Sequence, residues 1–165
     1  MARKISTLVS IRAARRADLD RIDAIEARSF AADRFSRAAI ARLLASPAAA
    51  VLVANTDRGL AGYAAVLFRR GAGVARLYSI AVDPDARGLG AAQALVAAAE
   101  GAARRRGADR LRLEVRASNT PARSLYDRAG FTFLEQRPGY YTDGEDAIRL
   151  EKRLLPKAAG GRGGV

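Results

Sequence analysis

The chain of 165 residues contains no cysteine, no histidine and no tryptophan. The lack of cysteine excludes disulfides, thiolate metal sites and a cysteine nucleophile. The lack of histidine removes the side chain that most often serves as a general base near neutral pH and as a metal ligand. No metal site is therefore expected, and acid–base chemistry must use carboxylates, tyrosine, lysine, water or the backbone.

Long apolar runs are also absent. No stretch is long and apolar enough to span a bilayer. The basic N-terminus, Met1–Ile5, is not followed by the apolar region of a secretory signal. From these two absences we expect a soluble cytoplasmic protein.

Basic residues outnumber acidic ones, 29 to 17, and give a net charge of +12. This balance raises the alternative of a nucleic-acid-binding module. The arginines are scattered, however, which favours a solvated surface that attracts anions in general. The length predicts one domain, residues 1–155, and the glycine-rich end predicts a disordered tail, residues 156–165.

Hydrophobic periodicity and turn residues divide the chain into strands and helices. The expected strands are 8–13, 50–54, 60–69, 74–82, 111–116, 131–135 and 146–154. The expected helices are 18–30, a second that Ser36 caps and Pro47 ends, 94–106, and one that opens at Ser118–Pro121 and ends at Gly130. The order βααβββαβαββ predicts an α/β (α+β) fold, with a mixed sheet covered by helices on both faces.

A glycine-bearing turn, Asp83–Gln93, lies between an expected strand and an expected helix. The first N–H groups of a helix have no partner within it, and the helix dipole adds positive charge there. Gly88 and Gly90 allow a phosphate to approach these groups closely, and Arg87 adds a full charge. Gly-x-Gly before a helix is common by itself, and no Gly-Lys-Ser/Thr of a P-loop follows. The turn nevertheless predicts a site for the pyrophosphate of a cofactor.

Several motifs in one order resemble the GNAT superfamily of N-acetyltransferases, from about Leu8 to Leu154. The first is Gln/Arg-x-x-Gly-x-Gly/Ala, present as Arg87–Ala92. Within the superfamily the chain is most similar to RimI-type enzymes, which acetylate the N-terminal amine of ribosomal and other proteins. The motifs that carry this likeness are Leu113–Asn119, Leu125-Tyr126, Gly130-Phe131, and Gly139–Tyr141 before Asp146-Ala147. The resemblance implies a GNAT fold, a twisted and mostly antiparallel sheet of about seven strands.

The resemblance also implies roles for single residues. Glu114 matches the family's general base and Tyr126 its general acid. The residues that match the site for acetyl-CoA are Ile80, Ala81, Val82, Arg87, Gly88, Leu89, Gly90, Ala91, Ala92, Gln93 and Asn119. The residues that border the expected peptide site are Phe30, Phe35, Tyr140 and Tyr141. The segment Phe30–Ser36 lacks the Pro-Trp often found there in RimI-type enzymes.

The chemistry of the reaction limits the acceptor. An α-amino group has a pKa of about 7.7–8.0 and a lysine side chain one near 10.4, so an N-terminal amine is easier to deprotonate. A protein or peptide N-terminus is therefore the expected acceptor, with a small amine such as a polyamine, amino acid or aminoglycoside as the alternative. A backbone N–H near Val82 would stabilise the oxyanion if its strand bulges away from the next one.

Each candidate also has a structural interpretation. Glu114 could pair with Arg112 and Arg116 on the surface of its strand. Tyr126 could pack against the sheet, and Tyr140 and Tyr141 could anchor a loop. Asn119 could act only as a helix cap.

Overall fold

The computed structural model describes residues 8–30 and 33–154. The expected tail, residues 156–165, lies outside these residues, and the single domain of residues 1–155 stays a prediction. The strands are β1 (Ser10–Ala13), β2 (Ala49–Thr56), β3 (Gly59–Phe68), β4 (Val74–Val82), β5 (Arg110–Arg116), β6 (Thr132–Arg137) and β7 (Ala147–Arg153). The helices are α1 (Leu19–Ser29), α2 (Arg37–Ala45), α3 (Ala91–Arg105) and α4 (Thr120–Arg128), with short 3₁₀ helices η1 (Arg16–Asp18) and η2 (Pro84–Ala86).

The seven strands form one sheet in the order β1-β2-β3-β4-β5-β7-β6. Five of the six strand pairs are antiparallel, and only β4 and β5 run parallel. The predicted mixed, mostly antiparallel sheet and the predicted order of elements are confirmed. No helix in the described part of the chain is long and apolar enough to cross a membrane.

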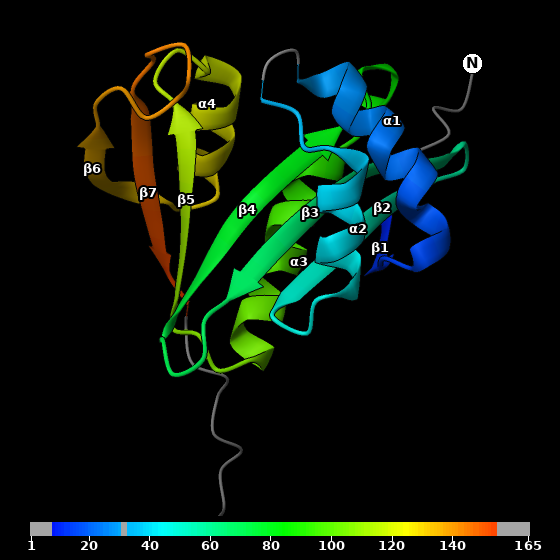
Figure 1. Ribbon diagram of the computed structural model, residues 1–165, viewed down its shortest axis with the longest axis horizontal. Helices are drawn as coiled ribbons and strands as arrows, with labels where there is room; N and C mark the ends of the chain where they lie inside the picture. The colour runs from blue at the N-terminus through cyan, green and yellow to red at the C-terminus, as the bar shows by residue number, and fades with distance from the viewer. Residues whose placement is uncertain (1–7, 31–32, 155–165) are drawn as a thin grey trace, which may run out of the picture.

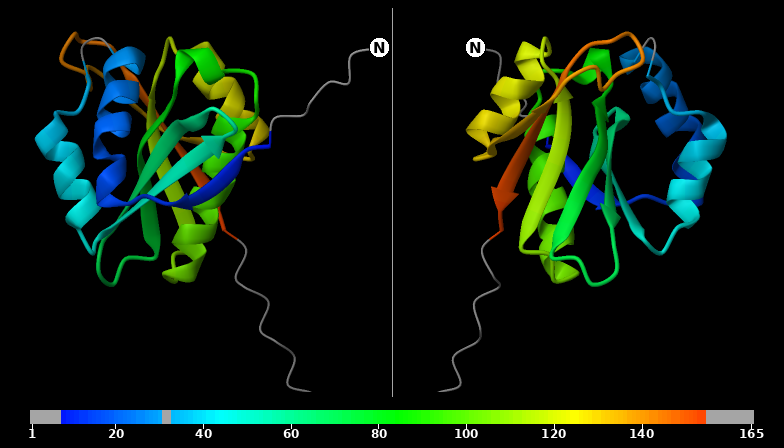
Figure 2. Two further views of the ribbon diagram at one scale, coloured as in Figure 1. Left: turned by 90° about the vertical axis from the view of Figure 1, so that its right-hand side faces the viewer. Right: turned by 60° about the vertical axis from the view of Figure 1, so that its left-hand side comes forward.

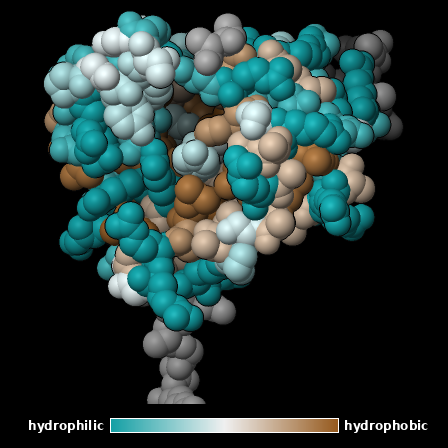
Figure 3. Space-filling model, in the orientation of Figure 1, coloured by the Kyte–Doolittle hydropathy of each residue, from teal (hydrophilic) through white to brown (hydrophobic). Residues whose placement is uncertain are grey.

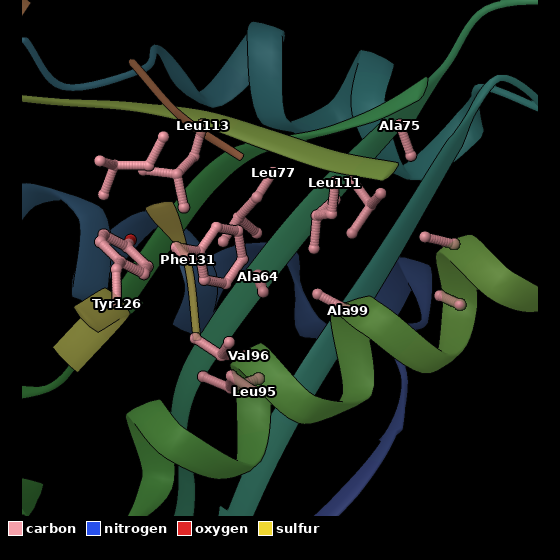
Figure 4. Close-up of a cluster of buried hydrophobic side chains, with 14 of the residues drawn as sticks. Ala64, Ala75, Leu77, Leu95, Val96, Ala99, Leu111, Leu113, Tyr126 and Phe131 are labelled. Carbon is pink, nitrogen blue, oxygen red and sulfur yellow. The ribbon is translucent and has the colours of Figure 1, made fainter. Parts of the chain in front are cut away.

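Helices cover both faces of the sheet (Figures 1 and 2). On one face α1 and α2 bury Ile22, Ile25 and Ile40 against β2 and β3. On the other face α3 and α4 pack on a larger apolar cluster (Figure 4), whose members include Leu77, Leu95, Val96, Leu111, Leu113, Tyr126 and Phe131. The alternation of β5 is therefore as predicted, with its leucines toward α3.

Local signals set most of the helix ends. The Ser36 hydroxyl accepts the Ala39 N–H at 3.1 Å and caps α2, and the Asn119 side chain accepts the Ala122 N–H at 3.2 Å and caps α4. The predicted start of α3 at Ala94 is wrong, because the helix begins at Ala91. Gly90, with a left-handed φ of +83°, ends the preceding turn, and the alanines after it are already helical.

The sheet opens between its two central strands. The β4–β5 pairing joins only Val74–Arg76 to Arg110–Arg112. Beyond it β4 continues to Val82, whereas β5 stays paired to β7 along its whole length. A bulge at Tyr78 accompanies the divergence, because Ala65 pairs with Ser79 and the next residue with Leu77. The two strands spread apart toward the top of Figure 1.

Candidate active site

The opening between β4 and β5 leads into a cavity of about 520 Å³. Its walls come from α1, β4, β5, α4 and the β6–β7 loop, and in the space-filling view a hollow with apolar atoms lies near the centre of this face (Figure 3). Seven of the predicted site residues line it together: Phe30, Phe35, Ile80, Glu114, Asn119, Tyr126 and Tyr141. The splayed strands thus bring residues from distant segments to one place.

The free edge of β4 offers backbone groups to this opening. The Asp83 N–H donates to the Ala61 carbonyl of β3 at 2.7 Å. Since backbone groups alternate in direction along a strand, Ala81 also faces β3, while the N–H groups of Ile80 and Val82 point toward the opening. The bulge that the oxyanion prediction required lies at Tyr78, before these two residues.

The turn after β4 leaves its amides available. None of the backbone N–H groups of residues 87–93 donates to a described protein group; the first one of the helix with an acceptor is Ala94, which donates to the Gly90 carbonyl at 3.0 Å. Gly88 and Gly90 have φ values of +80° and +83°, and a Cβ on Gly88 would meet no atom within 4 Å. This turn fits a diphosphate, because unpaired amides at a helix N-terminus bind anions.

Asp83 anchors the turn to α1. Its carboxylate, 3% exposed as a residue, accepts hydrogen bonds from Arg21 and Arg28 at 2.7 Å each and from the Asp85 N–H at 2.9 Å. The backbone bond and these two guanidinium groups lower the pKa of Asp83. The start of the turn is thereby fixed at one orientation.

Glu114 projects from β5 toward the cavity, with its side chain only 8% exposed. One carboxylate oxygen accepts from Arg76 at 3.0 Å, and the other accepts from Arg149 at 3.2 and 2.9 Å. Pairing with Arg112 and Arg116, the structural alternative, does not occur. Arg149 is the direct cross-strand neighbour of Glu114 on β7, a closer arrangement than two residues along one strand.

Tyr126 lies on α4 and is 5% exposed. Its ring meets that of Phe131 edge to face, with the centroids 5.6 Å apart (Figure 4). Its hydroxyl makes no hydrogen bond with the described residues, although it belongs to the wall of the cavity. Burial raises the pKa of Tyr126, so the phenol keeps its proton and is available as a donor.

The bulged residue, Tyr78, lines the cavity beside Phe35. The two rings stack with centroids 4.9 Å apart, and the Arg76 guanidinium lies 5.3 Å from the Tyr78 ring centre. The sequence does not identify Tyr78 as a site residue, because Tyr78 lies in an apolar run that predicts only a buried strand. A bulge, which turns one residue out of register, left no signal in that run.

Two loops close the other end of the cavity. Arg116, at the end of β5, pairs with Asp33 before α2 and with Asp143 and Glu145 before β7. Its guanidinium also lies 4.1 Å from the ring centre of Tyr141, and burial raises the pKa of that phenol to about 12. Tyr140 does not belong to the cavity lining, and the residue is 39% exposed.

A buried polar chain backs the wall formed by α1. Tyr63 donates to Glu26 at 2.5 Å and is 2.8 Å from the Ser79 hydroxyl, and the Phe35 N–H donates to the other Glu26 oxygen at 3.0 Å. Burial raises the pKa of Glu26 although both bonds oppose the shift. Sequence reasoning missed Glu26, but its place among Ile22 and Ile25 on the apolar stripe was a signal. Nearby, the Ser29 hydroxyl is buried in the cavity wall without a partner among the described residues.

Comparisons with known proteins give one family. The model of the acetyltransferase (GNAT) family matches residues 17–131. The chain is 36% identical over 145 residues to the "Putative [ribosomal protein bS18]-alanine N-acetyltransferase" of Bacillus subtilis (strain 168), covering 87% of this chain and 95% of that protein.

Two solved structures are similar to this chain over most of its length. The ribosomal-protein-S18-alanine N-acetyltransferase of Escherichia coli superposes with a TM-score of 0.81 at 30% identity, over 93% of this chain and 99% of that one. Ard1 from Thermoplasma volcanium superposes with a TM-score of 0.80 at 25% identity, over 89% and 98%. The similarity extends over nearly the full length of both proteins.

Proposed function

Since the chain belongs to the acetyltransferase (GNAT) family and is an N-acetyltransferase that uses acetyl-CoA, we propose that its acceptor is the N-terminal α-amine of a protein or peptide. The observation that carries the proposal is the cavity between β4 and β5, which is bordered by the two loops around Phe35 and Tyr141. A ribosomal protein is the finer proposal, supported by the names of the Bacillus and Escherichia relatives. We place the reaction in the cytoplasm, where ribosomal proteins and acetyl-CoA meet.

Acetyl-CoA supplies an activated thioester. We assign its pyrophosphate to the amides of residues 87–93, which have no partners among the described residues. The N–H groups of Ile80 and Val82 are the donors for the pantetheine arm and the acetyl carbonyl, because they face the opening beside the turn. The backbone of Ala81 faces β3, so Ala81 helps to hold its two neighbours in position and does not itself donate to the cofactor. We also assign Asn119, which caps α4, to the cofactor site.

Proton transfer falls to two side chains that line the cavity, Glu114 and Tyr126. Glu114, on β5, takes the proton that the ammonium form of the acceptor must lose, directly or through a water molecule. Tyr126, on α4, holds its proton because of burial and gives it to the departing sulfur. Neither role requires histidine, which the chain lacks.

The acceptor occupies the end of the cavity between α1 and the β6–β7 loop. Phe30 and Phe35 form one side, and Tyr141 forms the other. Ser29 adds a buried hydroxyl that has no protein partner among the described residues and can bond to a peptide group of the acceptor. Tyr140 lies farther out, where its hydroxyl accepts from Arg76 at 3.0 Å.

The test is acetyl transfer measured as free-thiol release from acetyl-CoA, with mass spectrometry of the acceptor. The panel contains peptides that begin with alanine and with other residues, the same peptides with a blocked N-terminus, and small amines that include a polyamine and an aminoglycoside. We expect acetyl groups on the α-amine of free peptides only. Transfer to the small amines in preference to every peptide would overturn the acceptor assignment.

A further inference from the structure

One side chain joins the two loops that border the acceptor end of the cavity. Arg116 donates to Asp33 in the α1–α2 loop, and to Asp143 and Glu145 in the β6–β7 loop at 2.8 and 2.9 Å. We call Arg116 with these three carboxylates the Arg116 clamp. The two loops are more than a hundred residues apart in the sequence, so their relative position depends on contacts of this kind.

Among the described residues, Arg116 is the one side chain that makes hydrogen bonds to both loops. Within residues 8–30 and 33–154, no hydrogen bond or ion pair runs directly from residues 33–36 to residues 138–146. Each loop is also held to the fold separately. The Phe35 N–H donates to Glu26 of α1, and the Ser118 N–H after β5 donates to the Glu145 carboxylate at 3.0 Å. Removal of the guanidinium would therefore remove the direct link between the loops. An indirect link would remain, in which Phe35 stacks on Tyr78 and Arg76 contacts both Tyr78 and Tyr140.

The chemistry of arginine suits this place. A guanidinium presents five donors in a planar fork, so one side chain can satisfy carboxylates from two directions. The side chain of Arg116 is only 22% exposed, and its carboxylate partners raise its pKa, so it stays charged. The guanidinium also lies over the Tyr141 ring, and this cation–π contact helps to fix the position of an aromatic side chain in the cavity wall.

We propose that Arg116 is a positioning residue that clamps the two loops around the acceptor and thereby sets the affinity for the acceptor peptide. This role rests on the proposed function. Arg116 makes no hydrogen bond to Glu114 or Tyr126, the two groups assigned to proton transfer. The clamp therefore acts on acceptor binding and leaves the transfer step to those residues.

The kinetic test compares Arg116→Gln with Arg112→Gln. Arg112 is a matched control, because it lies on the same face of β5 and pairs with one carboxylate, Glu151, at 2.5 Å, away from the cavity lining. We expect Arg116→Gln to raise the KM for the peptide roughly tenfold, with kcat and the KM for acetyl-CoA within about twofold of wild type. An unchanged peptide KM, or a fall in kcat alone, would overturn the proposal.

Hydrogen exchange provides a readout that does not depend on turnover. In Arg116→Gln the amides of both loops, such as Phe35 and Tyr141, should exchange faster, whereas those of β2 and β3 should not. Arg112→Gln should change neither loop. Faster exchange in one loop alone, or in neither, contradicts the clamp even if the acceptor assignment is correct. Conversely, a wild-type enzyme that acetylates no peptide refutes the proposed function, whereas the exchange result would still show whether Arg116 links the loops.

Arg116→Lys separates the clamp from a general loss of charge or stability. A lysine keeps the positive charge but has no planar fork to hold carboxylates from both loops. We expect a peptide KM and loop exchange rates between those of wild type and Arg116→Gln. If the peptide KM and the exchange rates of Arg116→Lys equal those of wild type, a positive charge alone is enough to hold the loops. The planar geometry of the guanidinium would then not be needed.

Discussion

Arg149 donates two hydrogen bonds to a single oxygen of Glu114 across the β5–β7 pair, at 3.2 and 2.9 Å. Arg76 occupies the other oxygen from β4, at 3.0 Å. The proposed base is therefore held from both neighbouring strands, at the level where β4 and β5 begin to separate. Its carboxylate is fixed in orientation toward the cavity, which is what proton transfer in a defined direction requires.

The first prediction concerns this carboxylate. Glu114→Gln keeps the size of the side chain but removes the base, and kcat should fall about 10²- to 10⁴-fold. The substitution also removes the negative charge that pairs with the guanidinium groups of Arg76 and Arg149. The free energy of unfolding should therefore fall by roughly 1–3 kcal/mol. Steady-state kinetics and urea denaturation measure the two effects.

Glu135→Gln is the control for Glu114→Gln. Glu135 also accepts from Arg149, at 2.6 Å, but its side chain is 44% exposed and lies outside the cavity lining. Its kcat should stay within about twofold of wild type. Equal losses of kcat in the two variants would assign Glu114 a structural role only.

The second prediction concerns Tyr126. Tyr126→Phe removes a hydroxyl without a hydrogen-bond partner among the described residues and keeps the contact with Phe131, so stability should change by less than about 1 kcal/mol. The loss of the proposed proton donor should lower kcat about 10²- to 10⁴-fold. Because burial raises the pKa of Tyr126, the wild-type rate should show no decline from its ionisation below about pH 10. A variant with wild-type kcat would exclude the phenol as the acid.

Much of the fold could be predicted because its signals are local. Gly107, Pro47 and the caps Ser36 and Asn119 end or begin elements by their own backbone chemistry. β4 was predicted with the bounds that it has, Val74–Val82. The start of α3 was missed because alanine gives no boundary signal, and only the conformation of Gly90 locates it.

The candidate site could be predicted only in part, because its remaining members meet through tertiary contacts. Glu114 and Tyr126 lie in sequence motifs, but the partners of Glu114, Arg76 and Arg149, come from strands that become neighbours only in the folded sheet. Tyr78 enters the cavity through a bulge that depends on its pairing with β3. No spacing along the chain encodes either relationship.

The third prediction tests the turn that is assigned to the pyrophosphate. Gly88→Ala adds a Cβ at φ +80°, beside amides that no described protein group occupies. The strain of roughly 1–2 kcal/mol and the added methyl group should raise the KM for acetyl-CoA about tenfold. Gly71→Ala is the matched control: its φ is +74°, its Cβ would also meet nothing within 4 Å, and it lies in the β3–β4 turn. The control should lose similar stability with no change in this KM; parallel changes in KM would contradict the assignment.

The fourth prediction concerns the pH dependence of stability through Glu26. Burial raises its pKa above the ordinary value of 4.5, so above that pH the folded state binds more protons than the unfolded state. Stability from this group is complete below the unfolded pKa and is lost as the pH rises through the folded one. Glu26→Gln does not titrate and therefore removes this pH-dependent loss of stability. The glutamine can keep the hydrogen bonds, because its oxygen accepts the Phe35 N–H and its NH₂ donates to Tyr63, which then donates to Ser79. The stability of Glu26→Gln relative to wild type should therefore increase between pH 4.5 and pH 8 in urea denaturation. A difference that is constant over this range would show that Glu26 has the same pKa in both states.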